Sequence, residues 1–140
     1  MYNTLIFACF FAILFYVVIK NKSSKNITAK SRMAHNAIIN FDVPARKIDV
    51  FKILMNMNNS DFKLERIEPE NNLVVYEDPT TLLSNGTFLL VICKLDQNGN
   101  VNSIDVGAKP KWGIAFKKPL NHFKNQLAGL LTINDFKISV

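Results

Sequence analysis

Cysteine and histidine are scarce in this sequence, and their scarcity limits the chemistry that it can carry. Only two of each occur among 140 residues. Cys9 lies in an apolar run and Cys93 in a predicted strand, so the two are not expected to pair, and a small domain without disulfides is typical of a reducing compartment. His35 and His122 have no Cys, Asp or Glu at the spacing of a metal site. We therefore expect neither a disulfide nor a metal ion.

Acidic residues are absent from the first 32 positions, where five basic residues occur: Lys20, Lys22, Lys25, Lys30 and Arg32. From residue 33 onward twelve basic residues face eleven acidic ones, so that part is nearly neutral. The formal net charge of +6 therefore comes mostly from the N-terminal region. A basic collar beside an apolar segment is typical of contact with a membrane surface, and we do not expect a nucleic acid as partner.

Motifs for catalysis are also missing. The segment Ser84-Asn85-Gly86-Thr87 has one glycine and no lysine at phosphate-loop spacing, so it is predicted to be a turn. Cys93 is expected to be a small buried hydrophobe rather than a nucleophile. Acidic residues gather near residues 65–78, where we expect a solvated edge. Because no nucleophile, base and orienting group can be named together, the sequence predicts no enzyme and no cofactor.

An uninterrupted apolar run of fifteen residues, Leu5 to Ile19, is the most distinctive feature that the sequence does have. As a helix this run would rise about 22 Å, which is shorter than the hydrocarbon core of a bilayer, about 30 Å. Adding Tyr2 to Thr4, and letting the lysines after the run snorkel, brings the length to about 20 residues, which suffices to span a bilayer. A secretory signal would need a small-x-small cleavage site after the run, and none is present. We predict a transmembrane anchor at residues 1–20; a cleaved signal and a buried core helix are the alternatives.

The lysines after the run predict the orientation of the anchor. Positive flanks stay cytoplasmic, so the N-terminus is expected outside and the domain in the cytoplasm, at the inner membrane. Residues 21–35 are polar, basic and aperiodic, and they are predicted to form a linker.

Residues 36–140 are predicted to form one small α+β domain. Alternation predicts strands at 37–43, 62–68, 72–77, 87–95 and 101–108, with 87–95 central because it is the most apolar. Pro44 is expected to end the first strand and to begin a helix that runs to Met57, and a second amphipathic helix is expected from Pro119 or Leu120 to about Leu131. The order β-α-β-β-β-β-α predicts an antiparallel sheet of about five strands with both helices on one face. The tail from Thr132 to Val140 has the composition of a short strand or of an ordered extension.

These elements resemble small bacterial relatives of the START-type helix-grip proteins. The residues that carry the resemblance are Val43 to Phe51, Ser84 to Thr87, Trp112 and Asn121-His122-Phe123, and it covers about 90 residues. The resemblance implies a domain that binds something hydrophobic. Full helix-grip domains have more strands and a longer final helix over a ligand cavity.

Residues 109–118, which we call the basic loop, interleave lysines with Trp112 and Phe116. One interpretation is a second membrane contact, with the lysines near an anionic surface and the tryptophan at headgroup level. The other is that the two aromatic residues cap the end of the sheet while the lysines point to water. The residues that the first interpretation assigns to the membrane surface are Lys20, Lys22, Lys25, Lys109, Lys111, Trp112, Lys117 and Lys118.

Together these features predict a single-pass membrane protein whose domain binds an apolar ligand or lipid near the membrane surface, without catalysis. A membrane-tethered module for protein–protein interaction is the alternative. The expected partners are the lipid bilayer and either an apolar small molecule or a membrane-associated protein.

Overall fold

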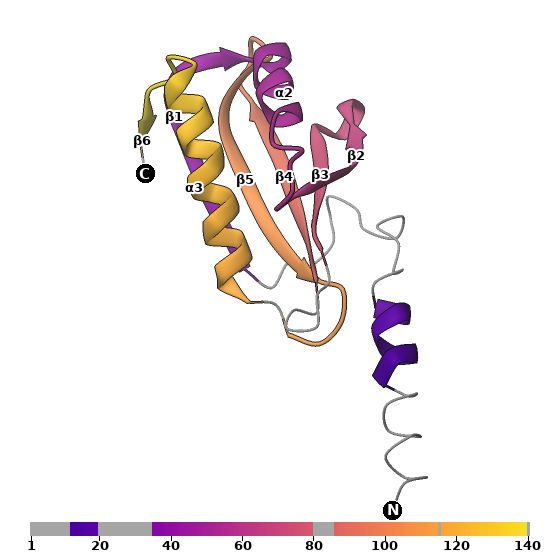
Figure 1. The fold of residues 1–140 in the computed structure, drawn as a ribbon. Coiled ribbons are helices and arrows are strands. Elements are labelled where there is room, and N and C mark those ends of the chain that lie inside the picture. The colour runs from indigo at the N-terminus through magenta and orange to yellow at the C-terminus, as the bar shows by residue number, and fades with distance from the viewer. Residues whose placement is uncertain (1–11, 20–34, 80–85, 115, 140) are drawn as a thin grey trace, which may run out of the picture.

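The computed structural model describes residues 12–19, 35–79, 86–114 and 116–139 of the chain. From residue 35 onward the described chain forms an antiparallel sheet with two α-helices and a short 3-10 helix, η2 (Pro69–Asn71), so the predicted α+β class is confirmed (Figure 1). The six strands lie in the order β2-β3-β4-β5-β1-β6. The C-terminal tail supplies the sixth strand, which sequence alternation left uncertain. The bounds of the strands are β1 His35–Arg46, β2 Lys63–Glu68, β3 Leu73–Asp78, β4 Thr87–Leu95, β5 Asn100–Pro110 and β6 Ile138–Ser139.

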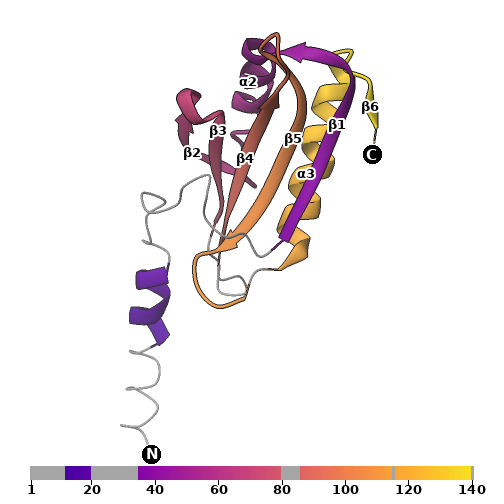
Figure 2. The ribbon, with the colours of Figure 1, turned by 180° about the vertical axis from the view of Figure 1, so that it is seen from behind.

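Two helices, α2 (Lys47–Met55) and α3 (Lys117–Ile133), cover the same face of this sheet. Figure 2, seen from behind, shows β1 and β5 in front of α3. The helices bury apolar stripes at the spacing of helical turns: Val50, Ile53 and Leu54 in α2, and Leu120, Phe123, Leu127 and Leu131 in α3. These stripes and the inward side chains of the sheet form a single core. The predicted placement of both helices on one face is therefore confirmed.

Pro44 lies inside a strand, and the prediction that it ends the strand and begins a helix is wrong. Strand β1 continues to Arg46, and α2 begins at Lys47. The pairing of β1 with β5 is interrupted between Asn40 and Ala45. A proline lacks a backbone N–H, and in this interval the sheet does not require one. The strand therefore tolerates Pro44 at the bulge.

Strand β4 is buried on both faces, as its apolar sequence predicts for a central strand. Leu89, Val91 and Cys93 face the helices, whereas Phe88 and Leu90 face the opposite side of the sheet. The latter two join Leu73, Val75 and Ile92 in a second apolar cluster. The sheet therefore has apolar side chains buried on both of its faces.

The predicted anchor is described only in part. Residues 12–19 are helical, whereas residues 1–11 and 20–34, and with them most of the predicted linker, lie outside the described residues. Within the described ranges, no helix combines the length and the apolar composition needed to cross a membrane.

Candidate functional site

The basic loop connects β5 to α3 at the end of the domain that faces residues 12–19 (Figure 1). Its apolar side chains point outward: Trp112 is 52% exposed, Ile114 78% and Phe116 57%. Gly113 adopts a positive φ of 72°, which an L-residue rarely takes, and this turn lies between the first two of them. Trp112 and Phe116 thus keep about half of their surface open to solvent, and both interpretations of the basic loop stay predictions.

The helix at residues 12–19 lies against this loop. The rings of Phe15 and Trp112 meet edge to face, with 4.7 Å between their centroids and an interplanar angle of 85°. The sequence predicts nothing of this contact, because the two residues are almost a hundred positions apart. The helix also exposes large apolar side chains: Ile13, Leu14, Phe15, Val17 and Val18. We call these five residues together with Trp112, Ile114 and Phe116 the apolar end surface.

The lysines of the basic loop occupy different environments. Lys117 and Lys118 are exposed in the first turn of α3, and Lys109 is half-buried at the end of β5. Lys111 was predicted to contact a membrane surface, but its side chain is fully buried. It therefore does not belong to the surface set. The other predicted contacts, Lys20, Lys22 and Lys25, lie outside the described residues.

Lys111 is held by a buried ion pair. Its ammonium group binds the carboxylate of Glu77 on β3 and lies 5.4 Å from the centre of the Phe88 ring. Its backbone N–H donates to the carbonyl oxygen of Gly86 at 3.1 Å. The side chain and the backbone of Lys111 thus fix the start of the exposed part of the loop to the sheet.

Glu65 extends this pair into a three-residue cluster. A hydrogen bond between the carboxyl groups of Glu65 and Glu77, assisted by burial, raises the pKa of Glu65. Burial acts to raise the pKa of Glu77 as well, but the hydrogen bonds from Glu65 and Lys111 outweigh it and leave that pKa below its ordinary value. The acidic edge expected to be solvated is therefore partly engaged with a buried lysine. Only the register of the sheet brings these residues together, so no sequence pattern could have indicated the cluster.

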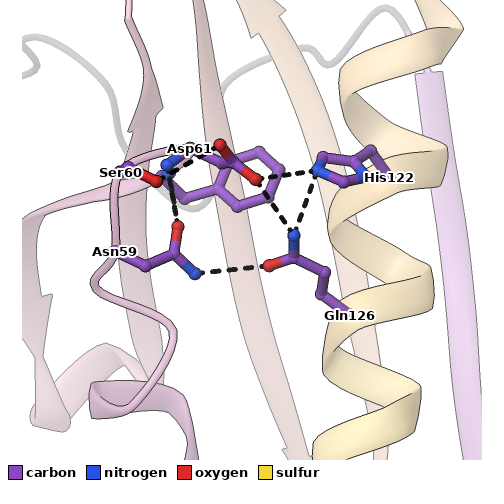
Figure 3. A network of polar contacts seen from close by, with 6 residues as sticks. Asn59, Ser60, Asp61, His122 and Gln126 are labelled. Carbon is purple, nitrogen blue, oxygen red and sulfur yellow. Dashed lines mark hydrogen bonds and ion pairs between the residues drawn. The ribbon is translucent and has the colours of Figure 1, made fainter.

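A second polar network joins the α2–β2 loop to α3 (Figure 3). Asp61 Oδ2 lies 3.1 Å from His122 Nε2 and accepts a hydrogen bond from Gln126 Nε2 at 3.3 Å. Asn59 donates from Nδ2 to Gln126 Oε1 at 3.3 Å, and its own Oδ1 accepts from the backbone N–H of Asp61 and of Phe62. His122 is exposed near the start of α3.

The electrostatics of this network act mainly on two carboxyl groups. Hydrogen bonds from His122 and then Gln126 lower the pKa of Asp61. Burial raises the pKa of Asp78 at the end of β3, against the opposing effect of His122. Within the described parts of the chain, no group of three or more His, Cys, Asp or Glu side chains is arranged to hold a metal ion. The network connects two segments, and it also includes Ser60, whose hydroxyl group donates to Asp61 Oδ1 at 3.5 Å.

The space between α3 and the sheet is filled with aromatic rings. Phe123 is fully buried, with its ring centroid 5.0 Å from those of both Phe62 and Tyr76. The Tyr76 hydroxyl donates to the Leu54 carbonyl oxygen. Cys93 is buried as predicted, and burial raises the pKa of its thiol to about 12.

A depression of about 690 Å³ lies at the far end of the domain, between α3 and β6, and it is lined by Asp42, Ala128, Thr132, Asp135, Phe136, Lys137 and Ile138. It is open and combines polar with apolar side chains. No family model, curated protein or solved structure matches this chain.

Proposed function

We propose that the chain is a membrane-anchored α+β domain that works at a lipid surface and carries out no chemistry of its own. The observation that carries this proposal is the helix at residues 12–19, which exposes five large apolar side chains. An exposed apolar stretch of this kind is unfavourable in water and stable in a bilayer. The sequence extends the same composition back to Leu5.

The orientation follows from charge. The five basic residues between positions 20 and 32 favour the side of the membrane on which positive flanks are retained. We therefore propose that the domain is cytoplasmic and that residues 1–20 are the anchor.

The ligand of the domain is proposed to be lipid at the surface rather than a molecule enclosed in its core. Support comes from the ring of Phe123, which occupies the space between α3 and the sheet where an internal ligand would lie. A relationship to helix-grip proteins remains part of the proposal. It is supported by the sheet order β2-β3-β4-β5-β1 with α3 packed on one face. In this proposal the lipid binds to the outer surface of the domain and does not enter a cavity.

Membrane retention of the full chain tests the anchor. We expect the wild-type protein to stay with membranes through carbonate washing, because the apolar run remains in the bilayer. The variant Phe10→Arg, at the middle of residues 1–20, should be released to a large extent, since an arginine at the centre of a span costs roughly 2.5–3.5 kcal/mol. The matched control Asn102→Arg adds the same charge at an exposed position of β5 and should be retained. Release of the wild-type chain, or equal retention of both variants, would refute the proposal.

A tethered interaction module is a second candidate function, and the edge of β1 favours it. Strand β6 pairs with β1 only at Asn40 and Phe41. Among the described strands, none pairs with the outer edge of β1 from Asn36 to Ile39, and an open edge of this kind can accept a strand from a partner. Cross-linking in membranes should then capture a partner that Ile38→Lys loses, because a charge on an edge strand opposes such pairing. An identical cross-linking pattern for both proteins would exclude this function.

A further inference from the structure

We infer that the basic loop is a second lipid contact, which inserts Trp112, Ile114 and Phe116 into the headgroup region of an anionic bilayer and thereby holds the domain in one orientation. This inference rests on the proposed anchor. A flexible tether alone would leave the domain free to tumble above the membrane. A second contact would instead give it a fixed face toward the lipid.

Position is the first argument. Trp112 touches Phe15, which lies four residues before residue 19, the last helical residue that the structure describes in this segment. At 1.5 Å per residue this is a depth of about 6 Å along the helix axis. Interfacial apolar groups sit about 5–10 Å into the boundary between headgroups and acyl chains. If the helix enters the bilayer at its C-terminal end, the contact with Phe15 brings the tryptophan to the depth that this side chain prefers.

Preorganisation is the second argument. Lys111 fixes one end of the exposed segment through Glu77 and Gly86, and Leu120, which is 3% exposed, fixes the other end in the core. Between these points Trp112, Ile114 and Phe116 are exposed. A segment whose two ends are already fixed loses less conformational entropy when it inserts into lipid. The segment between Lys111 and Leu120 exposes three large apolar residues, and this indicates that it contacts another surface, which we infer to be lipid.

Charge selects the kind of lipid. No acidic residue occurs between Asp105 and Asp135, and the first turn of α3 carries Lys117 and Lys118 with no acid. The positive end of the α3 dipole adds to the same potential. Of the acidic groups near this end, Glu77 is engaged by Lys111 and Asp61 by His122, and burial raises the pKa of Asp78 at the end of β3. The surface around the apolar side chains is thus complementary to anionic headgroups.

Trp112 provides the probe, since it is the only tryptophan of the chain. The full chain is reconstituted into liposomes of phosphatidylcholine alone or mixed with phosphatidylglycerol. Quenching of the emission by lipids brominated near the headgroup, and protection from aqueous acrylamide, are then measured. We expect strong quenching by the brominated lipid and protection from acrylamide in anionic liposomes, with both effects smaller in phosphatidylcholine alone.

Two triple variants test whether the lysines of the basic loop, and not lysines elsewhere on the surface, cause the preference for anionic liposomes. The triple variant Lys109→Gln, Lys117→Gln and Lys118→Gln should lose the difference between anionic and zwitterionic liposomes. The matched control Lys52→Gln, Lys94→Gln and Lys137→Gln removes the same charge from the opposite end of the domain and should keep that difference. Circular dichroism of each variant checks that the fold is intact.

The outcomes distinguish this inference from the proposed function. A chain that stays in the liposomes while Trp112 remains open to acrylamide and unquenched overturns the second contact and leaves the anchor standing. An equal difference between anionic and zwitterionic liposomes in the two triple variants overturns it as well, because the lysines of the basic loop would then contribute nothing specific to the preference for anionic lipid. A chain that does not remain with liposomes of either composition overturns the anchor, and the second contact with it.

Discussion

Replacing Lys111 with methionine tests how the basic loop is held. Methionine keeps most of the apolar stem over the Phe88 ring and removes the ammonium group. Glu77 then loses its cation, although only 16% of its side chain is exposed to solvent. Because methionine and lysine side chains differ little in volume, the variant measures the loss of the ion pair with little change in packing.

The size of the effect follows from the burial of the two partners. Removing one member of a fully buried pair costs about 3–5 kcal/mol, since an uncompensated charge remains. Here Glu77 is partly exposed and hydrogen-bonded to Glu65. Because the pKa of Glu65 is raised, the two carboxyl groups can share a proton, which reduces the uncompensated charge. We therefore expect Lys111→Met to lower the free energy of unfolding by about 2–3 kcal/mol, at or just below the low end of that range. The double variant with Glu77→Gln should recover about 1 kcal/mol or more.

Urea titration of the full chain in mild detergent, followed by far-ultraviolet circular dichroism, measures these free energies. The control Lys118→Met changes an exposed lysine and should stay within about 0.5 kcal/mol of wild type. The reasoning is refuted if Lys111→Met unfolds at the same urea concentration as the control. Strict additivity of the two single variants in the double variant would also refute it, because the residues would then not be coupled.

Three further predictions concern other parts of the fold. In a Cys9→Ser background, Cys93 should resist maleimide until the protein is unfolded, because burial raises the pKa of its thiol to about 12; rapid labelling of the folded chain would contradict this. Asp135 has a φ of 64° at the C-terminal end of α3, so Asp135→Gly should raise the free energy of unfolding by about 0.5 kcal/mol in a urea titration, and a loss would count against a strained backbone. The lowered pKa of Asp61 means that its stabilising contribution is present above the ordinary carboxyl pKa of about 4 and is lost as pH falls through and below that value. Asp61→Asn should therefore lose less thermal stability than wild type on acidification, whereas the exposed control Asp49→Asn should follow wild type.

Local periodicity predicted most of the domain because strands and helices leave short-range patterns. The run at 87–95 is apolar at every position but two, Thr87 and Lys94, which indicates a central strand, and β4 is buried on both faces. In the turn after it, Asp96 Oδ1 accepts the backbone N–H groups of Asn98 and Asn100. Pro44 misled the prediction, since its effect depends on whether the neighbouring strand needs a hydrogen bond at that point.

The candidate site was predicted less completely. Its composition was visible in the interleaved lysines and aromatic residues, and the structure leaves about half of the surface of Trp112 and Phe116 exposed. The contact between Phe15 and Trp112 was not predicted, because nothing in either segment specifies the other. The polar network of Asp61, His122 and Gln126 was missed for the same reason, as its members lie about 60 residues apart.

The sequence by itself determined the apolar run with its basic collar, the order of the elements and the α+β class, since each depends on residues close together in the chain. Tertiary structure decided which side chains of the basic loop face outward. Lys111 and Lys117 are the same residue type in the same loop, yet one is buried and the other exposed. The difference arises because sheet register places Glu77, 34 residues away in sequence, beside Lys111. An ammonium group leaves water only where such a partner compensates for the lost hydration.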